Sequence, residues 1–185
     1  MTFAAVASLS HFAAALAFLA LAVLVGISWR RGPIGAWLVF AAAATALWAG
    51  TSAELFRQNE SPGTIMALLE VVRTGGWLAF LITVLSASRG ERQTSRGCMA
   101  MIVSVGALCV GVSVASLMDD ATVRSWLPDG IPDIALFGRL LLAVIGVLMV
   151  ENLLRNTPSE HRWAIKFLCF GIGGLFFYDF FLYAD

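Results

Sequence analysis

The stretch FAAVASLSHFAAALAFLALAVLVGISW, residues 3–29, contains no Asp, Glu, Lys or Arg and is followed at once by Arg30 and Arg31. A helix needs about 20 apolar residues to cross the roughly 30 Å hydrocarbon core of a bilayer, and this stretch exceeds that length. A secretory signal peptide would carry basic residues before a shorter apolar run, whereas here they follow a long one. The stretch is therefore predicted to span a membrane as a helix, with its N-terminus outside.

Further stretches of similar length and character follow along the chain of 185 residues. The six predicted spans cover residues 3–29, 34–55, 64–86, 97–118, 133–154 and 163–183. Hydrophobic residues make up 59% of the chain and charged residues 13%, which is about half the charge of a soluble domain. The predicted fold class is all-α, a polytopic transmembrane helical bundle. Residues 1–185 are expected to form one membrane domain with no soluble domain.

Basic residues are distributed unevenly over the connections between these spans. The first, third and fifth connections, with the residues adjoining them, hold Arg30, Arg31, Arg89, Arg92, Arg96, Arg155, Arg162 and Lys166. The second and fourth connections hold only Arg57 and Arg124. Because Lys and Arg gather in cytoplasmic loops, the odd connections are predicted to be cytoplasmic and both chain ends external. The sequence closes on YDFFLYAD, still apolar, and we expect it to be part of a longer protein.

Polar residues within the spans are the candidate functional residues. They are His11, Glu54, Glu70, Arg73, Arg139 and Asp179, with the aromatic residues Trp77 and Tyr178 close to them in sequence. A charge at membrane depth costs several kcal/mol and usually faces the bundle interior with a partner. At about 1.5 Å of rise per residue, all six polar residues fall in the outer half of the membrane. They are predicted to converge on one buried site near the external surface, where Glu70, Arg73 and Trp77 share a helical face.

Three interpretations of such a site remain open from the residues alone. It could be a charge network that fixes helix packing, a pocket for a small polar or amphipathic signal, or a proton or ion path. The path is the weakest of the three, because the inner halves of the spans are almost entirely apolar. Glu151 is the exception, and it lies near the cytoplasmic end of its span, where its carboxylate can reach the interface.

Small residues predict where helices approach each other closely. The candidates are the alanines of residues 41–44 together with Gly106, Gly111, Gly171, Gly173 and Gly174. Gly75 and Gly76 lie beside Arg73 and are expected to soften the third span.

The sequence carries no recognisable catalytic motif. It lacks HExxH, GxSxG, a P-loop and a dinucleotide fingerprint. Twelve Lys and Arg balance twelve Asp and Glu, which excludes the basic footprint of a nucleic-acid-binding protein. The three cysteines lie in apolar stretches without CxxC spacing, which argues against a disulfide framework or a zinc site. We therefore expect no catalytic residue, no metal and no cofactor in this segment.

Residues 151–185, ENLLRNTPSEHRWAIKFLCFGIGGLFFYDFFLYAD, resemble the membrane region of the PrsK-type sensor histidine kinases of bacterial PEP-CTERM/exosortase systems. The inner end of the fifth span, the segment PSEHRWAIKFL and the closing YDFFLYAD carry this resemblance. Residues 1–150 are similar only in their multi-span topology with an external N-terminus.

The resemblance implies a sensor that continues into further spans, a GAF-like region and a kinase core that binds ATP. It implies a cognate response regulator that controls exopolysaccharide and PEP-CTERM protein genes, a homodimer, and the inner (cytoplasmic) membrane of a Gram-negative bacterium. It gives functional weight to Arg162, Trp163 and Lys166 as cytoplasmic coupling residues, and to Tyr178 and Asp179. No kinase catalytic residue can be assigned to this segment. The alternatives to a signal-input domain are a small membrane transporter, expected to show inverted internal symmetry, and a structural membrane subunit.

Overall fold

The computed structural model describes residues 3–28, 32–58, 63–89, 95–118, 134–157 and 162–184. The helices are α1 (Phe3–Ser28), α2 (Pro33–Gln58), α3 (Thr64–Arg89), α4 (Ser95–Leu117), α6 (Ile134–Asn156) and α7 (Arg162–Ala184). These described ranges contain helices and no strand, and six helices are long and apolar enough to cross a membrane. The predicted all-α fold with six spans is confirmed, and the helix ends lie within a few residues of the predicted ones.

The chain divides into two compact units, and the division falls inside α3. The amino-terminal unit is Met1–Gly76 and holds α1, α2 and the first half of α3. The carboxy-terminal unit is Trp77–Asp185 and holds the second half of α3 with α4, α6 and α7. Helix α3 is continuous from Thr64 to Arg89, and the softening at Gly75 and Gly76 stays a prediction.

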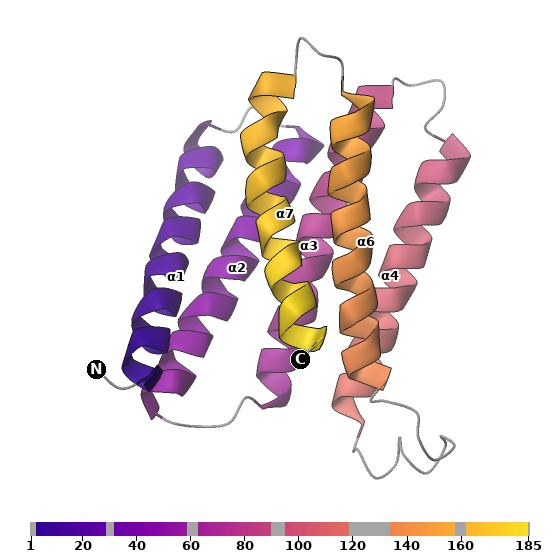
Figure 1. Ribbon diagram of the computed structural model, residues 1–185. Coiled ribbons are helices and arrows are strands. Elements are labelled where there is room, and N and C mark those ends of the chain that lie inside the picture. Colours follow the sequence, from indigo (N-terminus) through magenta and orange to yellow (C-terminus); the bar gives the residue numbers. More distant parts are fainter. Residues whose placement is uncertain are drawn as a thin grey trace. The chain divides into compact units, whose positions relative to one another are not determined.

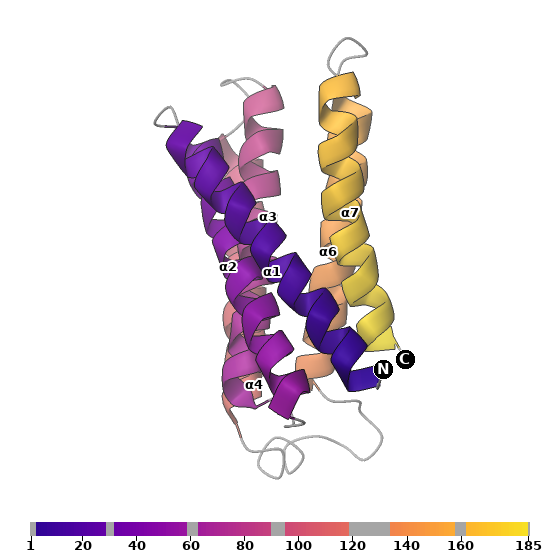
Figure 2. The same ribbon diagram turned by 90° about the vertical axis from the view of Figure 1, so that its left-hand side faces the viewer.

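In the amino-terminal unit α1 and α2 run antiparallel and side by side (Figures 1 and 2). Pro33 stands at the first position of α2, where its missing N–H costs nothing, and the N–H of Ala36 donates to the carbonyl of Gly32. Ser8 ties the two helices together, because its hydroxyl donates to the carbonyl of Ala53 at 2.9 Å.

The buried face of α2 consists mainly of small residues, as predicted for residues 41–44. It comprises Ala41, Ala42, Ala44, Thr45, Trp48, Ala49, Ser52 and Ala53. This face allows α3 to come close. A Cβ on Gly76 would lie 3.1 Å from the Phe40 ring and 3.3 Å from the Cα of Ala41, so a glycine is favoured at this contact.

In the carboxy-terminal unit α6 packs against α4 and against α7, which is seen beside α6 in Figures 1 and 2. Two glycines of α6 mark these contacts. A Cβ on Gly138 would overlap the Val112 side chain of α4, and a Cβ on Gly146 would overlap the Phe176 ring of α7. The largest fully buried apolar side chains of this unit are Leu78, Phe80, Leu81, Leu85, Leu142, Leu153 and Phe176.

The glycines predicted from the sequence to mark close packing are mostly different ones. A Cβ on Gly173 would make ordinary contact with Val150 at 3.5 Å. The other four, Gly106, Gly111, Gly171 and Gly174, are exposed, and an added Cβ would meet no described atom within 4 Å. The prediction is wrong for these four within the described chain, because they lie on outward helix faces.

Candidate functional site

Helix α3 carries a buried arginine in its amino-terminal half, which belongs to the amino-terminal unit. Arg73 of α3 is only 1% exposed, and its guanidinium carbon lies 4.1 Å from the centroid of the Trp48 ring on α2. A guanidinium is weakly hydrated and planar, so it can stack on an indole face with little loss of solvation. A desolvated contact of this kind is worth about 2 kcal/mol. The contact therefore links α2 and α3 at the polar end of this unit.

His11 extends the same cluster onto α1. Its Nδ1–H donates to the carbonyl of Ala7 at 3.0 Å, and its ring centroid lies 5.7 Å from Trp48 and 5.2 Å from Phe56. We name His11, Trp48 and Arg73 the Trp48 cluster. It contains one residue from each of the three helices of the unit.

Other polar groups surround the Trp48 cluster on the same helices. Glu70 is buried one turn before Arg73 on α3, and Thr74 is buried directly after Arg73. Ser52 of α2 donates to the carbonyl of Trp48 at 2.8 Å, which satisfies its buried hydroxyl within the helix. The indole Nε1–H of Trp48 is buried and has no hydrogen-bond acceptor among the described residues.

Glu54 was predicted to join this polar site, but it lies on an exposed part of α2. Its carboxylate accepts hydrogen bonds from Arg57, at 2.8 Å from Nε and 2.5 Å from Nη2, and another from Gln58. The side chains of Glu54 and Arg57 are 49% and 68% exposed, respectively. Arg57 lies three residues further along the same helix, so the pair is local and needs no tertiary contact.

The remaining predicted residues belong to the carboxy-terminal unit. Asp179 of α7 is 1% exposed, whereas the neighbouring Tyr178 is 50% exposed. Trp77 is buried and meets Phe80 edge-on, with ring centroids 6.0 Å apart. Arg139 of α6 donates from Nη2 to the hydroxyl of Ser116 on α4 at 3.0 Å.

The predicted site residues are thus shared between the two units. His11, Glu70 and Arg73 lie in the amino-terminal unit, and Trp77, Arg139, Tyr178 and Asp179 lie in the carboxy-terminal one. Trp48 contacts the buried Arg73 and Ser116 contacts the partly buried Arg139, but neither was among the predicted site residues. Their signal in the sequence is weak, because a tryptophan or serine in an apolar helix is common without any ionic partner.

The three residues proposed for cytoplasmic coupling lie at the start of α7. The Lys166 ammonium lies 5.6 Å from the Trp163 ring and 5.9 Å from the Phe170 ring, and Trp163 is exposed. Exposed aromatic and basic side chains at a helix end are typical of the membrane–water interface. The side chain of Arg162 lies outside the described residues.

The described residues contain no group of three or more His, Cys, Asp or Glu side chains that could hold a metal ion. Cys109 and Cys169 are free thiols within helices, and the side chain of Cys98 is outside the described part.

In comparisons with known proteins, no protein-family model, no curated protein and no solved structure matches the chain. The fold and the buried groups define the class on their own. The chain is a multi-pass α-helical membrane protein with charged side chains buried within its spanning segments.

The hydrogen bond between Arg139 and Ser116 is expected to make a modest contribution to stability. Ser116→Ala removes one acceptor of Arg139 and is expected to cost about 0.6 kcal/mol of unfolding free energy, the average for such bonds between membrane helices. Ser113→Ala is the matched control, because the Ser113 hydroxyl donates only to the carbonyl of Cys109 in its own helix. Unfolding in mixed micelles measures both, and equal effects of the two substitutions would show that the hydrogen bond between Arg139 and Ser116 contributes nothing to stability.

Proposed function

We propose that this chain is the membrane signal-input region of a sensor histidine kinase of the PrsK type. In this proposal the Trp48 cluster and the buried Glu70 form the input site, with the N-terminus and the polar ends of α1 to α3 on the external side of a bacterial inner membrane. The kinase region elsewhere in the protein would bind ATP, work as a homodimer and phosphorylate a response regulator for exopolysaccharide and PEP-CTERM protein genes. The resemblance of residues 151–185 supplies the kinase part of the proposal.

The observation that carries the input site is the burial of Arg73 against Trp48 within membrane-spanning helices. Ionisable residues at such depth are costly and mark functional positions more often than others. In α1 the polar residues lie near the start, and in α2 they lie in the second half, which the antiparallel arrangement brings to the same end. A carrier needs polar groups along the whole path, so a site confined to one end favours signal recognition over transport.

The geometry also suggests how a signal would reach the kinase. Arg73 lies in the amino-terminal unit, and α3 continues past Gly76 into the carboxy-terminal unit without a break in the helix. A signal that weakens or strengthens the stacking of Arg73 on Trp48 would act on a helix that both units share. To move an equilibrium from 1:99 to 99:1, the signal must prefer one packing by about 5.5 kcal/mol, which several buried polar contacts can supply.

The test uses the whole protein encoded by the native gene, in membrane vesicles, with labelled ATP. The expected result is phosphorylation on a histidine, with a level that Arg73→Met changes about fivefold or more, the lower end of typical coupling between sites. Arg155→Met is the matched control, because Arg155 is exposed and paired with Glu151 of its own helix, and it should leave phosphorylation unchanged.

Two outcomes would contradict separate parts of this proposal. A whole protein that takes no phosphate from ATP rules out the kinase. Normal phosphorylation and gene regulation in a folded Arg73→Met variant rule out the input site and leave a structural role. Where Arg73→Met does not accumulate in the membrane, Trp48→Phe keeps an aromatic face and tests the same contact.

A further inference from the structure

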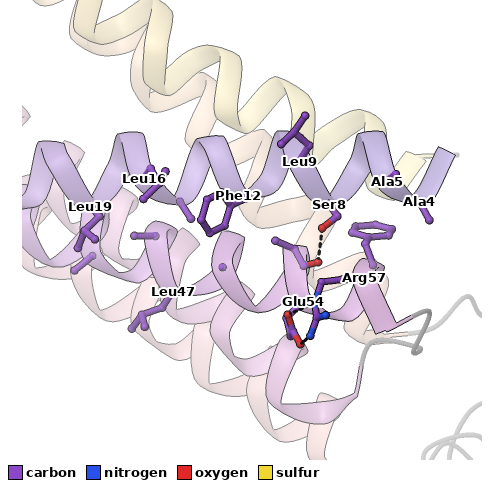
Figure 3. Close-up of a pocket in the computed structure, with 16 residues that line it drawn as sticks. Ala4, Ala5, Ser8, Leu9, Phe12, Leu16, Leu19, Leu47, Glu54 and Arg57 are labelled. Atoms are coloured by element: carbon purple, nitrogen blue, oxygen red, sulfur yellow. Dashed lines mark hydrogen bonds and ion pairs between the residues drawn. The ribbon is translucent and has the colours of Figure 1, made fainter. Parts of the chain in front are cut away.

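Helices α1 and α2 enclose a groove on the amino-terminal unit (Figure 3). Its volume is about 1110 Å³. Large apolar side chains of α1, namely Leu9, Phe12, Leu16 and Leu19, form one wall. Small residues of α2, among them Ala43, Ala46 and Gly50, line the opposite side. The body of the groove therefore offers an apolar surface to an occupant.

The polar groups of the groove are gathered at one end. Figure 3 shows Ser8, Glu54 and Arg57 together at that end, away from Leu16 and Leu19. The Ser8 hydroxyl already donates to Ala53, so the charged pair Glu54–Arg57 dominates this end. Arg57 lies in the last turn of α2, which places it where a spanning helix reaches the membrane–water interface.

The guanidinium of Arg57 is held in place and is still accessible. Its Nε and Nη2 donate to the two carboxylate oxygens of Glu54. A guanidinium has five N–H groups, so others remain on an edge of a side chain that is 68% exposed. An arginine fixed in this way presents a planar donor edge that suits a phosphate group.

We infer that this groove binds a membrane phospholipid, with an acyl chain along the apolar body and the phosphate at Arg57. The groove runs from Ala4 to Leu19 along α1, which is about 22 Å at 1.5 Å per residue. One leaflet contributes about 15 Å of hydrocarbon, half the core thickness, so the groove can hold the buried length of an acyl chain. A helix from a second copy would match the apolar body, but it would leave the charged end without a complement.

The charges at the polar end of the groove indicate which lipid headgroup the groove binds. Glu54 and Arg57 together carry no net charge, and they place an acid beside a base. A zwitterionic headgroup with a phosphate and an ammonium complements both, so a phosphatidylethanolamine fits the groove better than a purely anionic lipid. This inference is independent of the proposed signalling function.

The test is photocrosslinking in nanodiscs of phosphatidylethanolamine that contain a trace of the same lipid with a diazirine in one acyl chain. The expected result is label concentrated on peptides from α1 and α2, and a loss of at least fivefold in Ala46→Phe, which fills the groove. Ala107→Phe is the matched control, because Ala107 is an exposed alanine on α4, and it should label as the unaltered protein does. Arg57→Gln should reduce the label at α1 and α2 by weakening the hold on the phosphate.

Several outcomes would overturn the inference. Label spread over all exposed helices, or unchanged in Ala46→Phe, shows that lipid does not select the groove. A Leu16→Cys variant that forms disulfide-linked pairs of chains in high yield, where the unaltered protein does not, shows that a second copy occupies it. If Ala46→Phe does not fold, Ala46→Leu fills less of the groove and should give a smaller loss in the same direction.

Discussion

Replacing Gly146 by alanine is expected to destabilise the protein by about 1–3 kcal/mol, the usual effect of overpacking a well-filled core. A Cβ at this position of α6 would overlap Cγ, Cδ1 and Cε1 of the Phe176 ring on α7. Phe176 is fully buried, so its ring has little room to move away. The variant must therefore separate α6 from α7 or force Phe176 out of its preferred rotamer, and unfolding in mixed micelles measures the loss.

Two further variants make this result specific to the contact between α6 and α7. Gly171→Ala, on α7, adds the same methyl group where no described atom lies within 4 Å, and it should leave stability unchanged or raise it by up to about 1 kcal/mol through helix propensity. Adding Phe176→Leu to Gly146→Ala should recover part of the loss, because the smaller side chain leaves space for the methyl group. A Gly146→Ala variant as stable as the unaltered protein would contradict the packing described for α6 and α7.

The second large effect is expected at the contact between Arg73 and Trp48. Arg73→Met keeps most of the side-chain volume but removes the cation over the ring, and the contact it removes is worth about 2 kcal/mol when desolvated. Arg73→Lys should not restore the loss fully, because an ammonium is a strongly hydrated point charge and cannot stack as a planar guanidinium does. A double-mutant cycle with Trp48→Leu measures the interaction, and we expect a coupling energy of about 0.5–2 kcal/mol.

Arg155 provides the control for this cycle. Arg155→Met also removes an arginine from a spanning helix, but Arg155 is exposed and its ion pair is with Glu151, four residues earlier in the same helix. Its unfolding midpoint should stay unchanged, and its cycle with Trp48→Leu should be additive within about 0.5 kcal/mol. Additivity in the Arg73 cycle as well would mean that the observed stacking contributes nothing to stability.

Much of the fold could be predicted because spanning helices leave a strong one-dimensional signal. A helix satisfies its own backbone hydrogen bonds in lipid, and the uncharged stretch of residues 3–29 has the length that a spanning helix needs. The helix limits were set by local chemistry, such as Pro33 and Gly63, so prediction and structure agree closely there. The burial of Arg73, Glu70 and Asp179 follows from the same argument, because ionised groups avoid lipid.

The sequence predicted less well whether a residue lies on the inward or the outward face of its helix. Glu54 and Glu70 are both acids within predicted spans, yet Glu54 is exposed beside Arg57 and Glu70 is buried one turn before Arg73. In an apolar helix nearly every face is hydrophobic, so the sequence pattern does not distinguish the inward face from the outward one.

The sequence by itself therefore determined the class of the protein and, to within a few residues, the limits of the spanning helices that the structure describes. Only the tertiary structure decided which glycines lie at helix contacts, that Arg73 stacks on Trp48, and that α1 and α2 leave a groove with charges at one end. The physical reason is that entering a membrane depends on the summed hydrophobicity of a segment. Contacts between helices depend instead on which helix faces made of small residues meet, and this is settled only when the helices pack together.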